Sequence, residues 1–160
     1  MSLSQKIAAA LDENTRAYNL PCPVTVEDGP NRLTLNLTAL DSVGVAMESL
    51  EFVTTDRQDW SSEALKGWGE RLAARVTYLL EPLKVLEIDA AGSEVQIRSQ
   101  SPSGRADQRG FYEVRLHREG LLRMRRHLFD DATRQRRGIT CQFTREVLER
   151  LAGDIAASAS

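Results

Sequence analysis

The chain has 160 residues, of which 41% are hydrophobic and 28% are charged, and its formal net charge is −2. This composition is typical of a folded globular domain and excludes a disordered chain or a coiled-coil rod. No apolar run approaches the roughly 20 residues needed to cross a bilayer, and the first 16 residues lack the apolar core of a signal peptide. Because Cys22 and Cys141 are far apart in sequence, we expect one reduced, cytoplasmic domain over residues 1–160.

A helix followed by three strands is predicted for the N-terminal part of the chain. Ser2 and Gln5 have the spacing of a capping box at the start of a helix over residues 2–18. Pro21 ends this helix because proline cannot continue it. Alternating apolar residues then predict strands at 24–26, 33–37 and 43–52. The alternation changes parity at Glu48–Ser49, which predicts a β-bulge there.

The second predicted helix begins at Ser61, a good N-cap, and its apolar residues recur at spacings of three and four as far as Leu79. Gly67 and Gly69 flank Trp68 in this pattern. They indicate close packing of the helix on a sheet, with a groove beside the tryptophan as the alternative. A hairpin follows, in which Leu86 and Ile88 are expected to pair with Ile97 and Val95.

A polar segment without periodicity predicts a mobile loop near residues 99–109. The next hairpin is expected to have a three-residue turn, Arg118–Gly120, because this register pairs Leu116 with Leu122 and gives Gly120 the left-handed position. The same register places Tyr112 opposite Arg126, an arrangement that favours a cation–π contact.

One more strand is predicted at 139–143, after which Thr144 caps a final helix that ends in a frayed tail over residues 156–160. Strands therefore occur in hairpin runs between single helices, in the order α-βββ-α-βββββ-α. This order predicts an α+β domain with an antiparallel sheet of hairpins and helices packed on one face.

The charge is distributed unevenly along the chain. Residues 1–104 contain 9 Lys and Arg against 15 Asp and Glu, whereas residues 105–137 contain 10 Arg, no Lys and 5 acids. In the hairpin register chosen above, six polar side chains point away from the core. These are Glu113, Arg115, His117, Arg123, Arg125 and His127. We expect Glu113 to neutralise the facing Arg125, and the other arginines to meet carboxylates of the acidic body, of a second subunit or of a bound anion.

Other functional motifs are not evident in the sequence. No His or Cys pair has metal-ligand spacing, and neither phosphate-binding glycine motif occurs, so no metal, cofactor or catalytic group is predicted. Asp130–Asp131 could form an acid/base pair, but a turn beside arginine counter-charges is favoured.

The order of elements is similar to that of the type III secretion chaperones, over most of the chain and without a shared residue motif. That resemblance implies a small cytosolic homodimer that holds an unfolded segment of a partner, although an arginine-rich hairpin departs from the acidic surface of that family. We therefore expect a non-catalytic protein-interaction or chaperone-like module. The alternative is an anion- or nucleic-acid-binding protein that uses Arg115, Arg123, Arg125, His117 and His127.

A homodimer is expected in either case, since an unpaired strand edge accepts a partner strand and residues 111–117 contain no proline. Nucleic acid is the weaker alternative, because aromatic residues make up only 6% of the chain.

Overall fold

The computed structural model describes residues 1–14, 19–89, 91, 93–99 and 107–160. Three helices are present in these ranges, α1 (Leu3–Asn14), α2 (Ser62–Arg75) and α3 (Arg145–Ser158). The strands are β1 (Cys22–Asp28), β2 (Asn31–Leu40), β3 (Gly44–Thr54), β4 (Leu83–Ile88), β5 (Glu94–Ser99), β6 (Gln108–His117), β7 (Leu121–Asp130), β8 (Gln135–Ile139) and β9 (Cys141–Thr144). The predicted α+β class is confirmed, with one strand more than expected after α2.

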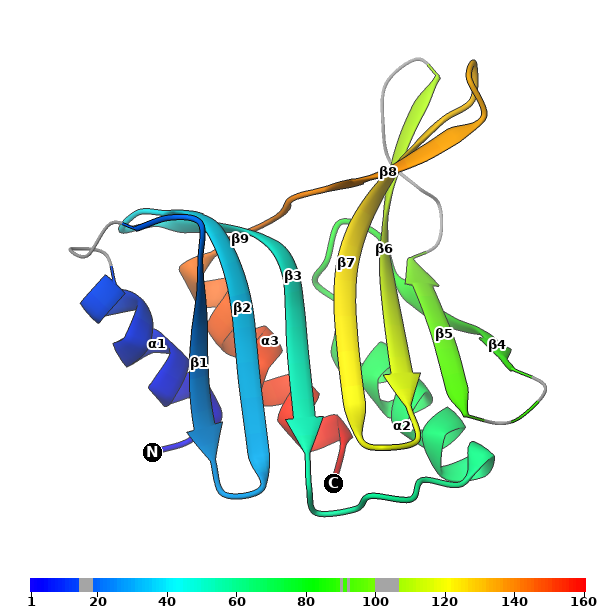
Figure 1. Ribbon diagram of the computed structural model, residues 1–160, viewed down its shortest axis with the longest axis horizontal. Helices are drawn as coiled ribbons and strands as arrows, with labels where there is room; N and C mark the ends of the chain where they lie inside the picture. The colour runs from blue at the N-terminus through cyan, green and yellow to red at the C-terminus, as the bar shows by residue number, and fades with distance from the viewer. Residues whose placement is uncertain (15–18, 90, 92, 100–106) are drawn as a thin grey trace.

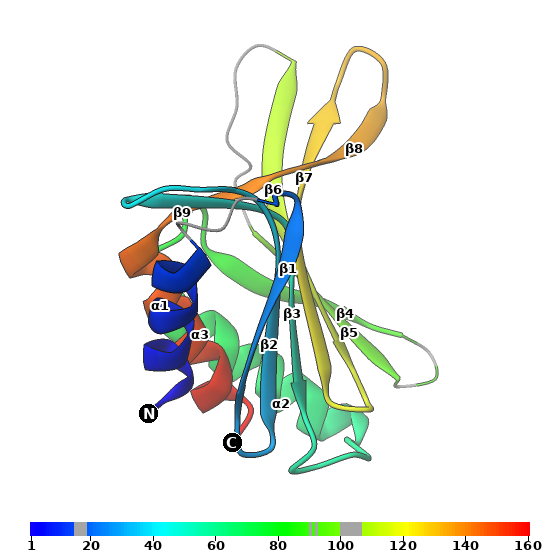
Figure 2. The same cartoon turned by 60° about the vertical axis from the view of Figure 1, so that its left-hand side comes forward.

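The strands form one antiparallel sheet in the order β1-β2-β3-β7-β6-β5-β4. All three helices cover the same face of this sheet, and the opposite face is left open (Figures 1 and 2). Strands joined by hairpins lie beside each other, and the link between the two halves of the sheet is the pairing of β3 with β7. The predicted arrangement of helices on one face is therefore confirmed.

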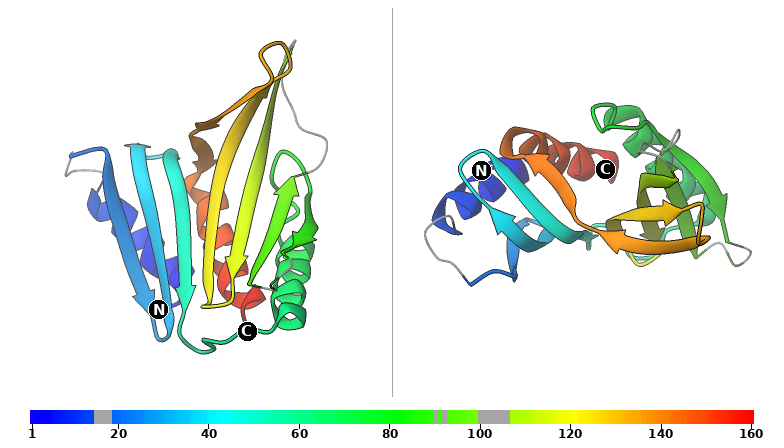
Figure 3. Two further views of the ribbon diagram at one scale, coloured as in Figure 1. Left: turned by 45° about the vertical axis from the view of Figure 1, so that its right-hand side comes forward. Right: turned by 90° about the horizontal axis from the view of Figure 1, so that it is seen from above.

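The two halves of the sheet separate at one end. Residues 50–53 of β3 pair with β7, whereas residues 44–47 of β3 pair with β9. The outer half of β7, residues 126–130, pairs with β8. The segment β8–β9 therefore crosses between the diverging strands, and its pairing changes partner at Thr140 (Figure 3).

Beyond this fork a three-stranded ribbon projects from the body of the domain (Figures 1 and 3). We call it the distal ribbon and define it as residues 108–112 of β6, 126–130 of β7 and all of β8. Its outer turn follows Asp130, whose Oδ1 accepts a hydrogen bond from the Ala132 N–H at 2.9 Å. The turn predicted at Asp130–Asp131 is thus present, and β8 follows it.

The predicted helix starts are found in the structure. Ser2 Oγ accepts from the Gln5 N–H at 3.2 Å and Gln5 Oε1 accepts from the Ser2 N–H at 2.9 Å, which completes the capping box. The Ser61 side chain accepts from the Ala64 N–H, and the Thr144 side chain accepts from the Val147 N–H. Each of these bonds satisfies an N–H that the first turn of a helix leaves without an intrahelical partner.

The register of the central hairpin is the one predicted. Val114 lies opposite Met124 and Leu116 opposite Leu122, while Gly120 in the turn has a φ of +88°. A Cβ at residue 120 would come within 2.5 Å of the Thr54 carbonyl oxygen. Glycine is therefore required there both by its conformation and by the space available.

Tyr112 and Arg126 make the predicted cation–π contact on the helical side of the sheet, with the guanidinium carbon 4.4 Å from the ring centroid. Arg126 also pairs with the buried Glu81 at 3.1 Å, and Ser99 Oγ donates to the same carboxylate at 2.9 Å. A buried carboxylate requires such partners, because it has lost its hydration.

The bulge predicted at Glu48–Ser49 is confirmed, since Leu35 lies opposite Leu50 while Leu37 lies opposite Met47. The pairing of Leu86 with Ile97 is wrong. A second irregularity places Val85 opposite Ile97 and leaves Leu86 49% exposed.

Helix and strand ends differ from the predictions at three further places. Helix α2 ends at Arg75, so Leu79 packs against the core from the segment after the helix. The strand predicted at 139–143 is divided at Thr140 between β8 and β9. Helix α3 continues to Ser158, inside the predicted frayed tail, because the fully buried Ser158 hydroxyl accepts a hydrogen bond from Trp68 Nε1 at 3.1 Å.

The predicted helix residues 15–18 and most of the predicted mobile loop, residues 100–106, lie outside the described part of the chain. None of the described helices is both long and apolar enough to cross a bilayer.

The core lies between the sheet and the three helices. Gly69 brings α2 close to the sheet, since a Cβ there would lie 3.1 Å from Val85 and 3.2 Å from Ile97. The packing interpretation of this glycine is therefore supported. All core residues predicted from the sequence are buried in one cluster, namely Leu35, Leu37, Val45, Leu72, Val76, Val114, Leu116, Leu148 and Leu151.

The outermost strands of the sheet are β1 and β4. Residues 113–117 of β6 pair with both β5 and β7, so this part of the 111–117 strand is not a free edge. Homodimerisation stays a prediction, and sedimentation at micromolar concentration would test it.

We expect Leu72→Ala to lower the free energy of unfolding by about 2–5 kcal/mol, because Leu72 is 2% exposed in the core and the truncation leaves a cavity. Chemical denaturation measures this loss. The matched control is Leu80→Ala, which removes a side chain that is 77% exposed and should change stability by less than about 0.5 kcal/mol. Equal effects of the two substitutions would contradict the assignment of the helix face.

Candidate functional site

Five of the arginines on the open face of the sheet lie on four neighbouring strands. They are Arg98 on β5, Arg115 on β6, Arg123 and Arg125 on β7, and Arg136 on β8. We call this surface the arginine face. Strand alternation explains it, because every second residue of a strand points to the same side, and on β5, β6 and β7 most of the intervening residues are buried.

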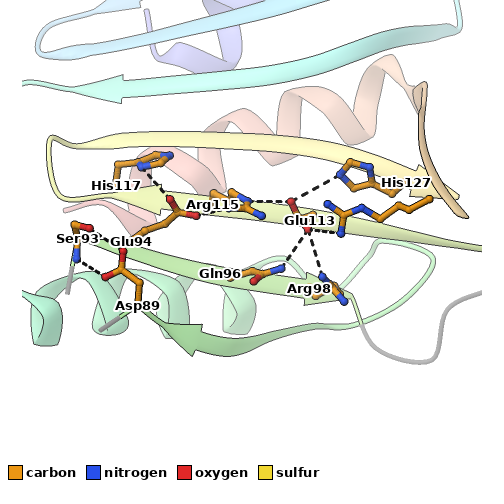
Figure 4. A network of polar contacts seen from close by, with 10 residues as sticks. Asp89, Ser93, Glu94, Gln96, Arg98, Glu113, Arg115, His117 and His127 are labelled. Atoms are coloured by element: carbon orange, nitrogen blue, oxygen red, sulfur yellow. Dashed lines mark hydrogen bonds and ion pairs between the residues drawn. The ribbon is translucent and has the colours of Figure 1, made fainter. Parts of the chain in front are cut away.

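A single carboxylate, that of Glu113, lies at the centre of the arginine face with its side chain 7% exposed (Figure 4). Arg115 Nε donates to its Oε1 at 3.0 Å, and Arg136 Nη1 donates to its Oε2 at 3.2 Å. Gln96 Nε2 donates to Oε2 at 3.2 Å, and Arg98 Nη2 lies 3.5 Å from the same oxygen. Both oxygens of this buried carboxylate are thus held by donors from three strands, its own strand β6 and the strands β5 and β8.

These donors keep Glu113 ionised. Burial alone raises the pKa of a carboxyl group, but the hydrogen bond from Arg115 and the charges of Arg136 and Arg115 outweigh it. The pKa of Glu113 is therefore below its usual value. An ionised Glu113 can in turn fix the guanidinium groups around it.

Two more carboxylates pair with the arginine face. Arg115 Nη1 donates to Glu94 Oε1 at 2.7 Å, and His117 Nδ1 lies 3.5 Å from Glu94 Oε2 (Figure 4). Arg123 donates through Nε and Nη2 to Glu51 Oε1, at 3.1 and 2.8 Å. Both acids belong to the acidic N-terminal part of the chain, which supplies the compensation expected for Arg115 and Arg123.

Arg125 differs from its neighbours. It lies directly opposite Glu113 across the hairpin, as predicted. The expected neutralisation is nevertheless wrong, because the Glu113 oxygens are taken by Arg115, Arg136 and Gln96. Within the described residues, the Arg125 side chain has no hydrogen bond or ion pair, and it is exposed. It is the one arginine of the face, among the described residues, whose charge has no carboxylate partner.

His127 lies in the distal ribbon, two residues after Arg125 on β7, with its side chain 12% exposed. Its Nε2 is 3.8 Å from Glu113 Oε1, which is too far for a hydrogen bond. The ring packs on Phe111, with centroids 5.7 Å apart. Burial, followed by the charge of Arg136, lowers the pKa of His127 below its usual value, so the imidazole is neutral at pH 7.

Three adjoining hollows lie on this face. The fork hollow, of about 370 Å³, lies where β3 and β7 diverge and is lined by Glu48, Ser49 and Thr140 together with Arg125 and His127. The central hollow, also of about 370 Å³, has Arg125 and His127 in its wall as well, and adds Arg115, Arg123 and Arg136. The aromatic cleft, of about 410 Å³, is formed by Phe111, Phe129, Arg98, Arg109, Asp131 and Arg136.

The five residues proposed from the sequence are therefore brought together. Arg115, Arg123, Arg125, His117 and His127 all line the central hollow. Sequence reasoning missed Arg98 and Arg136, which also contact Glu113. Arg136 could not be placed because the sequence predicts a turn at Asp130–Asp131 and no strand between that turn and residue 139. The alternation in β5 could have placed Arg98 beside Glu113.

The Cys141 thiol is buried in the core. Burial raises the pKa of the Cys141 thiol to about 12, so it is not a thiolate at neutral pH. Within the described residues, no three His, Cys, Asp or Glu side chains lie close enough to hold a metal ion. The described site is thus an array of fixed cations beside a groove.

Comparison with family models, curated proteins and solved structures found no match to this chain.

We expect the imidazole of His127 to titrate below the ordinary histidine pKa of about 6.5. At a pH between the lowered pKa of the folded protein and the ordinary pKa of the unfolded chain, the unfolded chain binds more protons than the folded protein. The free energy of unfolding therefore falls as the pH is lowered through this window. The histidine C2–H chemical shift, followed by NMR from about pH 8 to about pH 4, measures this pKa. His127→Gln should identify the resonance and flatten the pH dependence of stability. Titration at or above the ordinary value would contradict the burial and the arginine charges described here.

Proposed function

We propose that this protein is a non-catalytic binding module that holds an acidic segment of a protein partner on its arginine face. The observation that carries the proposal is Arg125. Its guanidinium is exposed and without a carboxylate partner in the described structure, and it lies in the wall of two adjoining hollows. A guanidinium presents paired donors that match a carboxylate, so a free acidic side chain is the ligand that it suits.

The neighbouring arginines are already paired with carboxylates of the same chain, and this supports the proposal. Arg115 is paired with Glu113 and Glu94, and Arg123 is paired with Glu51. Such pairs fix the walls of the hollow before a ligand arrives, which reduces the entropy lost on binding. A ligand carboxylate then gains the most binding free energy at the unpaired charge of Arg125.

The same pairing disfavours nucleic acid. Binding to a phosphate backbone depends on many cations that each neutralise one phosphate. Here three carboxylates, Glu51, Glu94 and Glu113, already compensate the arginines and would repel a run of phosphates. A ligand with one or a few carboxylates fits this charge distribution better than a polyanion does.

Arg125→Ala tests the proposal. We expect a fluorescent serine–threonine peptide with two glutamates, followed by anisotropy at low ionic strength, to bind the wild-type protein and to lose about tenfold or more in affinity for the variant. The fold should be unaffected, since Arg125 holds no other described side chain.

The matched control is Arg137→Ala, which removes an exposed arginine from the neighbouring strand β8. Arg137 lies opposite Leu128 and so points to the other side of the ribbon from Arg136. The control variant should bind the peptide as the wild type does. Equal losses in both variants would show that only net charge matters. Tighter binding of a single-stranded oligonucleotide, lost in Arg125→Ala, would replace this proposal with the nucleic-acid alternative.

A further inference from the structure

The three hollows of the arginine face adjoin one another through shared wall residues, and we call them together the groove. The fork hollow and the central hollow share Arg125 and His127 in their walls, and the central hollow and the aromatic cleft share Arg136. The groove therefore runs along β7 from the fork toward the end of the distal ribbon. A ligand held at Arg125 and long enough to follow the groove reaches the aromatic cleft.

The aromatic cleft differs chemically from the rest of the groove. Its walls are the rings of Phe111 and Phe129 and the side chains of three arginines, with Asp131 as its one acid among the described residues. Arg109 pairs with Asp131 at 3.2 Å. At about 410 Å³ the cleft is within the range of sites that enclose small apolar groups. It can thus accept an apolar side chain from a chain that is acidic elsewhere.

The distance between Arg125 and the aromatic cleft determines how far apart the carboxylate and the apolar side chain of the bound segment must be. Phe129 is four residues after Arg125 on β7, and both point to the open face. Four strand residues span about 13 Å. An extended partner segment that follows β7 covers this distance with the same number of residues, and its side chains at positions i and i+4 share one face.

The aromatic cleft suits an apolar side chain better than it suits the stacked bases of a single-stranded nucleic acid. Arg98 lies over the Phe111 ring at 4.9 Å and Arg136 at 5.9 Å, and the Phe111 residue is only 5% exposed. Single-stranded nucleic acids need aromatic faces that are open to the bases. With its ring already in contact with guanidinium groups, Phe111 is a wall and not a stacking platform.

We propose that the acidic segment bound by the arginine face carries an aromatic or large aliphatic side chain four residues from its carboxylate, and that this side chain enters the aromatic cleft. This inference rests on the proposed function. It adds a specificity element, since Arg125 selects the carboxylate and the cleft formed by Phe111 and Phe129 selects the apolar side chain.

Two extended peptides in a serine–threonine background test the proposal. One has glutamate and, four residues later, phenylalanine, and the other has alanine in place of the phenylalanine. We expect the wild-type protein to bind the phenylalanine peptide about tenfold or more tightly, as burial of one aromatic side chain predicts. Phe129→Ala should remove most of this preference, while Leu86→Ala, which removes an exposed apolar side chain from β4, should preserve it.

A cross-linking measurement needs no variant. A photoreactive phenylalanine analogue at the same peptide position should attach to Arg98 or to residues 109–111 or 129–136 of the wild-type protein. Attachment elsewhere would overturn the inference.

The outcomes separate this inference from the proposed function. If both peptides bind equally and both weaken with Arg125→Ala, the inference is wrong and the proposed function is retained. If neither peptide binds, both are overturned. If a single-stranded oligonucleotide of equal charge displaces the peptide at a lower concentration, nucleic acid replaces a protein segment as the ligand.

Discussion

A carboxylate removed from water must be surrounded by donors, and the open side of this sheet is organised around one such group. Glu113 has its side chain 7% exposed and receives hydrogen bonds from Arg115, Arg136 and Gln96. Removing the carboxylate would leave clustered guanidinium groups without compensation, while removing the arginines would leave a buried charge without partners. The Glu113 carboxylate and the arginines around it therefore hold each other in place, and together they set the shape of the arginine face.

This arrangement depends on how the sheet divides. The pairing of β3 with β7 ends at Leu50, and β8–β9 crosses the resulting fork. The crossing brings Arg136 from a segment late in the chain onto the same carboxylate as Arg115. Because Glu113 is then satisfied by other donors, the arginine directly opposite it, Arg125, is exposed and free of a carboxylate partner in the described structure. The free charge is a consequence of the fork.

Local rules were sufficient to predict most of the fold. Caps at Ser61 and Thr144 and the glycine at 120 each have a direct physical cause within a few residues, and the structure contains all three. The position of Leu86 could not be predicted, because a bulge depends on packing across strands and not on alternation alone. For the site, alternation placed the five hairpin residues on one face. It could not show which arginine each carboxylate selects, since Arg136 reaches Glu113 from β8 through a tertiary contact.

The central claim is that Arg125 is the contact point for an acidic partner on a face that is otherwise internally paired. NMR of the arginine Nε–H resonances during titration with the glutamate–phenylalanine peptide tests it most directly. We expect the Arg125 resonance to shift most and the Arg137 resonance to stay unchanged. The Arg136 resonance should shift second most, because Arg136 lines both the central hollow and the aromatic cleft. An unchanged Arg125 resonance, with shifts confined to β1, β4 or the helices, would contradict the central claim.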